Sequence, residues 1–297
     1  MSDKIAVALT DNGGFRIYAA VTTELVREAA KVHKCLPVAS AALGRTLTAT
    51  AIMGAMMKED DATVTVQVKG DGPLGTVLTV GNSRAEVKGY IQNPAVILPL
   101  NSKGKLDVGG GIGKGYLSVV RDNGKNGGQY TGQVELVSGE IAEDLTYYYA
   151  TSEQIPTAMA LGVLVDVDNI PKCAGGYVIQ MMPGHDPDDE KIITEIENNI
   201  ASLPSVSKMV EMGYSPEDII AAVMGSVKFG ILNEKTPSYK CDCSTARVER
   251  ALVSIGKKDL QSIIDDGKGT EVDCHFCNKT YKFTTDELKE LLKSCKR

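Results

Sequence analysis

The sequence predicts an α+β protein in three parts: an N-terminal domain of mixed β-sheet and helices, a helical middle segment, and a small C-terminal metal-binding domain. Three observations support this order. Short alternating strands separated by glycine-rich turns fill residues 1–182, and apolar residues recur at helical spacing within residues 183–237. Five of the seven cysteines lie within residues 238–297.

Composition limits the class of protein. The 297 residues suffice for about two domains, and a hydrophobic content of 43% can form a sizeable core. The net charge of −6 argues against a large nucleic-acid footprint. The uncharged run 46–57 would span about 18 Å as a helix, which is too short for a membrane core of about 30 Å. The N-terminus lacks the pattern of a secretory signal, so we expect a cytoplasmic protein without membrane partners.

The N-terminal domain is predicted to begin with a hairpin followed by a helix. The segment 11–14, Asp-Asn-Gly-Gly, is typical of a turn, and residues 15–21 have the composition of a strand. Thr22 or Thr23 is expected to cap a helix that ends near His33.

The next helix, at 38–57, carries apolar residues on nearly every face, which predicts full burial. Gly44 and Gly54 within it predict close packing against a neighbour. The glycine-rich run 109–115 does not fit a phosphate-binding loop and is interpreted as a hairpin turn. Further strands are predicted at 63–68, 76–80, 85–91, 115–121, 129–137, 163–167 and 177–182, with a helix at 140–152.

The middle segment follows a cluster of helix breakers at 183–187, which predicts a domain boundary. Ser215 and Pro216 are typical of a helix start. The apolar positions of the segment are expected to form adaptable faces. They are Ile192, Ile196, Ile200, Met209, Met212 and Met224.

The C-terminal domain is small and poor in large apolar side chains. Helices are predicted around residues 248–252, 260–264 and 288–292, and the last follows a capping box at 284–287. A core of this size is marginal by itself, so a bound metal would supply stability that the core lacks.

Two cysteine pairs carry the chemistry. Cys241 and Cys243 form a CxC pair, Cys274 and Cys277 form a CxxC pair, and 30 residues separate the two pairs. Four thiolates on one tetrahedral ion is a typical structural zinc site, so the spacing predicts one Zn²⁺ per chain. A purely architectural site and a redox switch both fit this spacing, because electron-rich sulfurs are open to oxidants.

Other reactive residues are given simpler interpretations. His275 lies inside the CxxC pair but is not needed to complete four ligands. Cys35 and Cys173 are expected to be buried, and no role is assigned to Cys295. The run 147–149 of three tyrosines is expected to divide between core and surface. No nucleotide fingerprint or catalytic constellation is found, so we predict no enzymatic activity.

The chain resembles the heat-shock protein 33 family of bacterial, redox-regulated holdase chaperones. The resemblance rests on the CxC and CxxC pairs and on four further motifs in the same order, so it covers almost the whole chain. These motifs are Q-x-x-G-D-G-P at 67–73, S-E-Q-I-P at 152–156, A-G-G at 174–176 and Q-x-M-P at 180–183.

The resemblance implies that the middle segment packs on the N-terminal domain and that the reduced, zinc-bound form is inactive. It implies that oxidative stress forms the disulfides Cys241–Cys243 and Cys274–Cys277 and expels zinc. The C-terminal domain and the middle segment would then unfold, and the protein, as a homodimer, would hold unfolding client proteins without ATP.

Two other functions remain open from the residues. One is a nucleic-acid-binding zinc module, although residues 241–297 contain 11 basic and 10 acidic residues and so form no basic stripe. The other is a dithiol–disulfide oxidoreductase, although enzymes of that kind place CxxC at a helix start in a βαβ unit.

Overall fold

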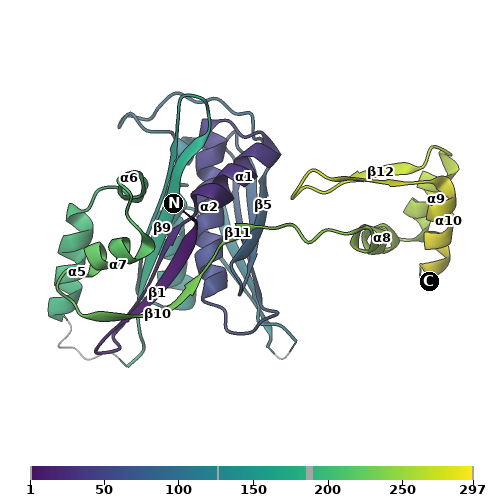
Figure 1. Cartoon of the computed structure of the whole chain (residues 1–297). Helices are drawn as coiled ribbons and strands as arrows, with labels where there is room; N and C mark the ends of the chain where they lie inside the picture. Colours follow the sequence, from purple (N-terminus) through teal and green to yellow (C-terminus); the bar gives the residue numbers. More distant parts are fainter. Residues whose placement is uncertain (1, 126, 185–189, 296–297) are drawn as a thin grey trace. The chain divides into compact units, whose positions relative to one another are not determined.

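The chain forms two compact units, Met1–Lys240 and Cys241–Arg297 (Figure 1). The computed structural model describes residues 2–125, 127–184 and 190–295. The predicted parts 1–182 and 183–237 lie together within the first unit. Most of the predicted breaker cluster at 183–187 lies outside the described residues.

A five-stranded antiparallel sheet forms one layer of the first unit, in the order β10-β1-β2-β9-β8. The predicted turn at 11–14 is confirmed, because it joins β1 to β2. The predicted strands at 163–167 and 177–182 have the wrong bounds, since β8 begins earlier and β9 is longer. The strands are β1 (Lys4–Thr10), β2 (Phe15–Val21), β8 (Thr157–Val165), β9 (Pro171–Met181) and β10 (Phe229–Lys235).

A six-stranded sheet forms a second layer, in the order β11-β5-β4-β3-β6-β7. Its neighbours are antiparallel except for the short parallel pair β11 and β5. The sequence predicts five of these strands to within two residues at each end. The strands are β3 (Thr63–Gly70), β4 (Thr76–Asn82), β5 (Glu86–Ile91), β6 (Gly115–Asp122), β7 (Gln129–Glu135) and β11 (Ser238–Tyr239).

Helix α2 (Pro37–Ala55) packs against both sheets and forms the centre of the main core (Figure 1). Its predicted burial is confirmed. Two of its three threonines form buried hydroxyl pairs, because Thr48 bonds to Thr22 at 2.7 Å and Thr50 bonds to Thr79 at 2.6 Å. The close packing predicted at Gly54 is also confirmed, since a Cβ there would clash with the backbone oxygen of Asn82. Among the described residues, no helix combines the length and apolar character needed to cross a membrane.

Helix α1 (Thr23–His33) is capped by a residue that the sequence did not indicate. Thr22 occupies the N-cap position, but its hydroxyl bonds to α2 and makes no cap. The carboxylate of Asp3 instead accepts hydrogen bonds from the backbone N–H groups of Glu24 and Leu25, at 3.0 and 2.7 Å. The predicted threonine cap is therefore wrong.

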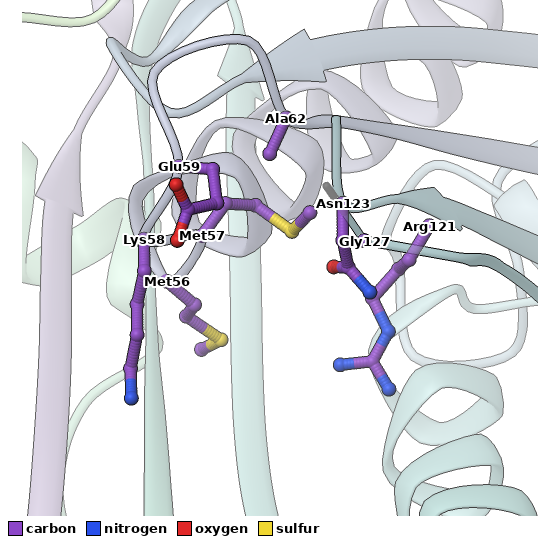
Figure 2. Close-up of a pocket in the computed structure, with 8 residues that line it drawn as sticks. All are labelled: Met56, Met57, Lys58, Glu59, Ala62, Arg121, Asn123 and Gly127. Carbon is purple, nitrogen blue, oxygen red and sulfur yellow. The ribbon is translucent and has the colours of Figure 1, made fainter. Parts of the chain in front are cut away.

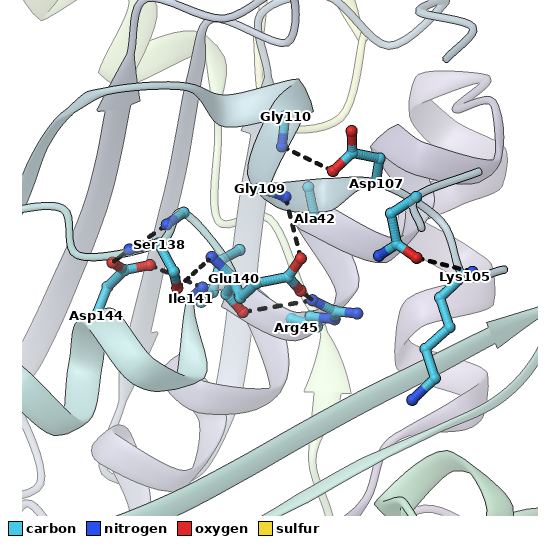
Figure 3. A network of polar contacts seen from close by, with 12 residues as sticks. Ala42, Arg45, Lys105, Asp107, Gly109, Gly110, Ser138, Glu140, Ile141 and Asp144 are labelled. Atoms are coloured by element: carbon cyan, nitrogen blue, oxygen red, sulfur yellow. Dashed lines mark hydrogen bonds and ion pairs between the residues drawn. The ribbon is translucent and has the colours of Figure 1, made fainter. Parts of the chain in front are cut away.

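The glycine-rich run at 109–115 is mostly helical, so its interpretation as a hairpin turn is wrong. Residues Val108–Ile112 form α3, and the side chain of Asp107 caps it by accepting from Gly110. Figure 3 shows Glu140 joining this helix to α2, because its carboxylate accepts from the backbone N–H of Gly109 and pairs with Arg45. The predicted helix at 140–152 divides into α4 (Ala142–Tyr148) and a π-helical turn, Tyr149–Glu153.

Three helices cover the other face of the five-stranded sheet: α5 (Glu190–Ser202), α6 (Val206–Glu211) and α7 (Pro216–Met224) (Figure 1). The predicted start of α7 is confirmed, because Ser215 and Asp218 form a capping box. Met209 and Met224 are fully buried against the sheet, but Met212 is 57% exposed and does not belong to the buried face. Strand β10 follows α7 and pairs with β1, which the sequence did not predict.

The described residues of the second unit form three helices and one hairpin. The predicted capping box at 284–287 is confirmed by reciprocal bonds between Thr284 and Glu287. Its core has six buried residues: Leu252, Leu260, Ile264, Tyr281, Phe283 and Leu288. The elements are α8 (Thr245–Ser254), α9 (Lys257–Asp265), β12 (Thr270–Asp273), β13 (Thr280–Phe283) and α10 (Thr285–Ser294).

Candidate metal centre

The two cysteine pairs lie on two kinds of local structure in the second unit. Cys241 and Cys243 belong to the extended segment before α8. Ser244 follows them and caps the first turn of α8. Cys274 and Cys277 lie in the turn that joins β12 to β13. In this turn the backbone N–H of Cys277 and that of Asn278 both donate to the carbonyl of Cys274, at 3.2 and 2.8 Å. The CxxC pair therefore forms a tight knuckle between two strands.

The four sulfur atoms converge on one point. All four Sγ atoms lie within 4.8 Å of one another. The Sγ atoms of Cys241 and Cys274 are 3.7 Å apart, and those of Cys243 and Cys277 are 3.4 Å apart. A tetrahedral site with Zn–S bonds of about 2.3 Å has sulfur–sulfur edges of about 3.8 Å. The donor set and its spacing therefore fit a tetrahedral metal ion.

Hydrogen bonding makes the four thiols unequal. Burial alone would raise the pKa of the Cys243 thiol, but hydrogen bonds from Tyr281 and the neighbouring thiols lower this pKa to about 7. The Tyr281 hydroxyl donates to Cys243 Sγ at 3.0 Å. Burial raises the pKa of both Cys241 and Cys277. A bound cation would favour the thiolate at all four positions.

The sulfurs also form part of the small core of the unit. Cys243 and Cys274 pack against its six buried residues. A core this small supports little stability alone, so ligation at its edge would join the segment before α8 to the β12–β13 hairpin. Asp242 forms an ion pair with Arg247 at 2.5 Å, but both side chains are about half exposed and add little.

The other reactive residues are not members of this group of four ligands. His275 is not one of the four grouped ligands found among the described residues. Cys35 and Cys173 are buried, as predicted. Cys295 is half-buried against the core of the second unit, with its Sγ 3.7 Å from the carbonyl oxygen of Val253. The tyrosine run divides as predicted, because Tyr147 is exposed whereas the next two residues are buried.

A hollow lies in the first unit at the C-terminal end of α2 (Figure 2). Its volume is about 400 Å³, and its described lining contains no Cys, His or Ser. The guanidinium of Arg121 lines it but is paired with Glu153, whose other oxygen accepts from the hydroxyl of Tyr148. The lining thus offers the thioethers of two methionines, the amide of Asn123, the amine of Lys58, the carboxyl of Glu59 and the ion-paired guanidinium of Arg121.

The sequence interpretation missed Tyr281. The contact with Cys243 depends on the pairing of β12 with β13 and on the path of the segment before α8. Alternation with Phe283 was the available signal, because residues two apart in a strand share a face. That signal predicts burial of Tyr281 and says nothing of a sulfur partner.

Known proteins match this chain over nearly its whole length. A family model described as Hsp33 protein matches residues 3–284, which include all four clustered cysteines. The 33 kDa chaperonin of Acetivibrio thermocellus is 48% identical over 293 residues, covering 99% of this chain and 98% of the relative. That of Clostridium perfringens is 51% identical over 294 residues, covering 98% and 92%. A crystal structure of the 33 kDa chaperonin, a heat shock protein 33 homolog, from Thermotoga maritima matches with a TM-score of 0.88 and 39% identity, covering 99% of each chain.

Proposed function

This chain belongs to the Hsp33 family, and we propose that it is an ATP-independent holdase chaperone that oxidation switches on. The observation that carries the proposal is the convergence of four cysteine sulfurs within a unit that has only six buried core residues among those described. Such a unit depends on its metal, so a reaction that removes the ligands also removes the fold.

In the reduced state, one Zn²⁺ per chain is held by Cys241, Cys243, Cys274 and Cys277. The ion would cross-link two segments that are distant in sequence, the segment before α8 and the β12–β13 hairpin. Four thiolates around one dication leave a charge of −2 on the site, and this charge makes the sulfurs attractive to electrophilic oxidants.

Oxidation forms the disulfides Cys241–Cys243 and Cys274–Cys277. Each bond takes two electrons from two thiolates, and one hydrogen peroxide, with two protons from the solvent, is reduced to two molecules of water. The short sulfur contacts run between the two pairs rather than within them. However, each proposed disulfide joins cysteines that are only two or three positions apart in sequence, so it can still form after the unit has lost its fold.

Client binding follows from a partial release of the middle segment, in which helices α5–α7 leave the five-stranded sheet and strand β10 stays in it. These helices bury an apolar face of the five-stranded sheet that includes Phe15 and Ile17, and α6 and α7 contribute Met209 and Ile220 to the same cluster. Separation of these helices from the sheet would expose two adaptable apolar surfaces, which suit weak binding to many unfolded proteins. The active form is a cytoplasmic homodimer that binds unfolding proteins rather than nucleic acid or membranes, and it acts without catalytic turnover.

A zinc assay with and without peroxide tests this proposal. Reduced protein is expected to contain one Zn²⁺ per chain, and peroxide is expected to release it while four thiols are lost. The variant Cys295→Ser serves as the control, because Cys295 lies outside the sulfur cluster and its loss should leave zinc content unchanged. Absence of zinc from the reduced protein, or retention of zinc after these thiols are oxidised, would contradict the proposal.

A further inference from the structure

The hydroxyl of Tyr281 contacts a predicted metal ligand directly. It lies 3.0 Å from the Sγ atom of Cys243, and its O–H is the donor. The side chain is well fixed, because Tyr281 is only 6% exposed and belongs to the core of the second unit. Lys279 Nζ lies 5.0 Å from the centre of its ring. The hydroxyl is therefore held on the sulfur by packing of the ring.

A hydrogen bond to a ligand sulfur changes the chemistry of that sulfur. A metal-bound thiolate uses one electron pair for the metal, and its remaining pairs react with electrophiles. A donated O–H engages one of these pairs and withdraws electron density from the sulfur. Hydrogen bonds to sulfur ligands tune the properties of metal–thiolate sites, and outer partners of this kind also orient the ligand.

We propose that Tyr281 is a positioning residue that holds Cys243 in the metal site and slows its reaction with electrophiles. The inference rests on the proposed function, because it assumes that the four cysteines bind a metal. It adds a control on the sensitivity of the switch: the hydroxyl sets how readily one sulfur of the CxC pair is attacked while the metal is still bound. An oxidant must then compete with this hydrogen bond.

The variant Tyr281→Phe tests the proposal, because it removes the hydroxyl and keeps the ring. The matched control is Phe283→Leu, which perturbs the same strand and the same core but leaves the hydroxyl in place. Both variants and the wild type are loaded with Zn²⁺ in the reduced state. Alkylation of Cys243 by iodoacetamide is then followed by mass spectrometry at fixed pH, where a carbon–sulfur bond forms and iodide leaves.

The expected result is alkylation of Cys243 that is several-fold faster in Tyr281→Phe than in Phe283→Leu. Affinity for Zn²⁺, measured by competition with a chromophoric chelator, should fall by about 10-fold or more. In the Co²⁺-loaded protein, the sulfur-to-metal charge-transfer bands should shift in Tyr281→Phe and not in Phe283→Leu. A shift of the Co²⁺ bands in Tyr281→Phe alone indicates loss of the hydrogen bond, because a general loosening of the fold would also change the spectrum of Phe283→Leu.

Equal rates and unchanged Co²⁺ spectra in the two variants would overturn the role of Tyr281 and leave the proposed function intact. Failure of the wild-type protein to bind Zn²⁺ at the four cysteines would overturn both proposals together. The measurements use reduced protein without any client, so a defect in chaperone activity does not affect their outcome.

Discussion

Removal of the metal is expected to unfold residues 241–297 and to leave the two sheets of the first unit folded. Structural Zn²⁺ contributes on the order of 10 kcal/mol or more to the folding of small zinc-binding peptides. The total stability of a domain is only about 5–15 kcal/mol. The second unit has six described buried core residues, so it has little other free energy with which to remain folded.

The variant Cys277→Ser provides the test, because it removes one ligand from the site. In this variant, the backbone amides of α8, α9 and α10 should lose protection against hydrogen exchange. The amides of β3 and β6 in the first unit should keep theirs. The control is Cys295→Ser, which removes a thiol from the same unit but not from the cluster. Full protection of the second unit in Cys277→Ser would mean that its fold does not depend on the metal.

A charge placed beneath the middle segment is expected to activate the chaperone without oxidation. Ile220 on α7 is fully buried in the cluster between the helices and the five-stranded sheet. An unpaired aspartate at this position would cost on the order of 3–5 kcal/mol, and separation of α7 from the sheet relieves that cost. Reduced, zinc-loaded Ile220→Asp should therefore suppress the aggregation of a client protein.

The control for this variant is Ala221→Asp, which places the same charge at the next, exposed position of α7. It should remain inactive when reduced. Hydrogen exchange in β3 and β6 shows whether the rest of the first unit is folded in each variant. An Ile220→Asp protein that keeps this protection, loses that of α5–α7 and still fails to suppress aggregation would refute a masking role for the middle segment.

Much of the fold was predictable because its signals are local. The residues of α2 are apolar on nearly every face, and β3 alternates between buried and half-buried or exposed positions from Thr63 to Lys69. The grouping of the four cysteine sulfurs could be expected because CxC and CxxC are each compact motifs whose thiols are typical ligands of one tetrahedral ion. Each motif can be found within a few residues of sequence.

The missed elements depend on partners that are distant in sequence. Strand β10 is mostly exposed and shows no alternation, because its backbone pairs with β1 while its side chains remain in contact with solvent. Strand β8 packs against both α2 and α6. Its sequence is therefore a continuous apolar run and lacks the alternation of a half-buried strand. Helix α3 contains three glycines and depends on the Asp107 cap and on packing against Leu74. Local propensity argues against a helix there.

The most direct test of the redox switch is light scattering from a heat-unfolded client protein, with no nucleotide added. Oxidised, zinc-free protein is expected to suppress the scattering at near-stoichiometric amounts, because helices α5–α7 would have left the face of the five-stranded sheet. Reduced, zinc-loaded protein is expected to leave the scattering unchanged. Equal suppression by both forms would contradict the account and would indicate a constitutive chaperone whose four cysteines serve only its architecture.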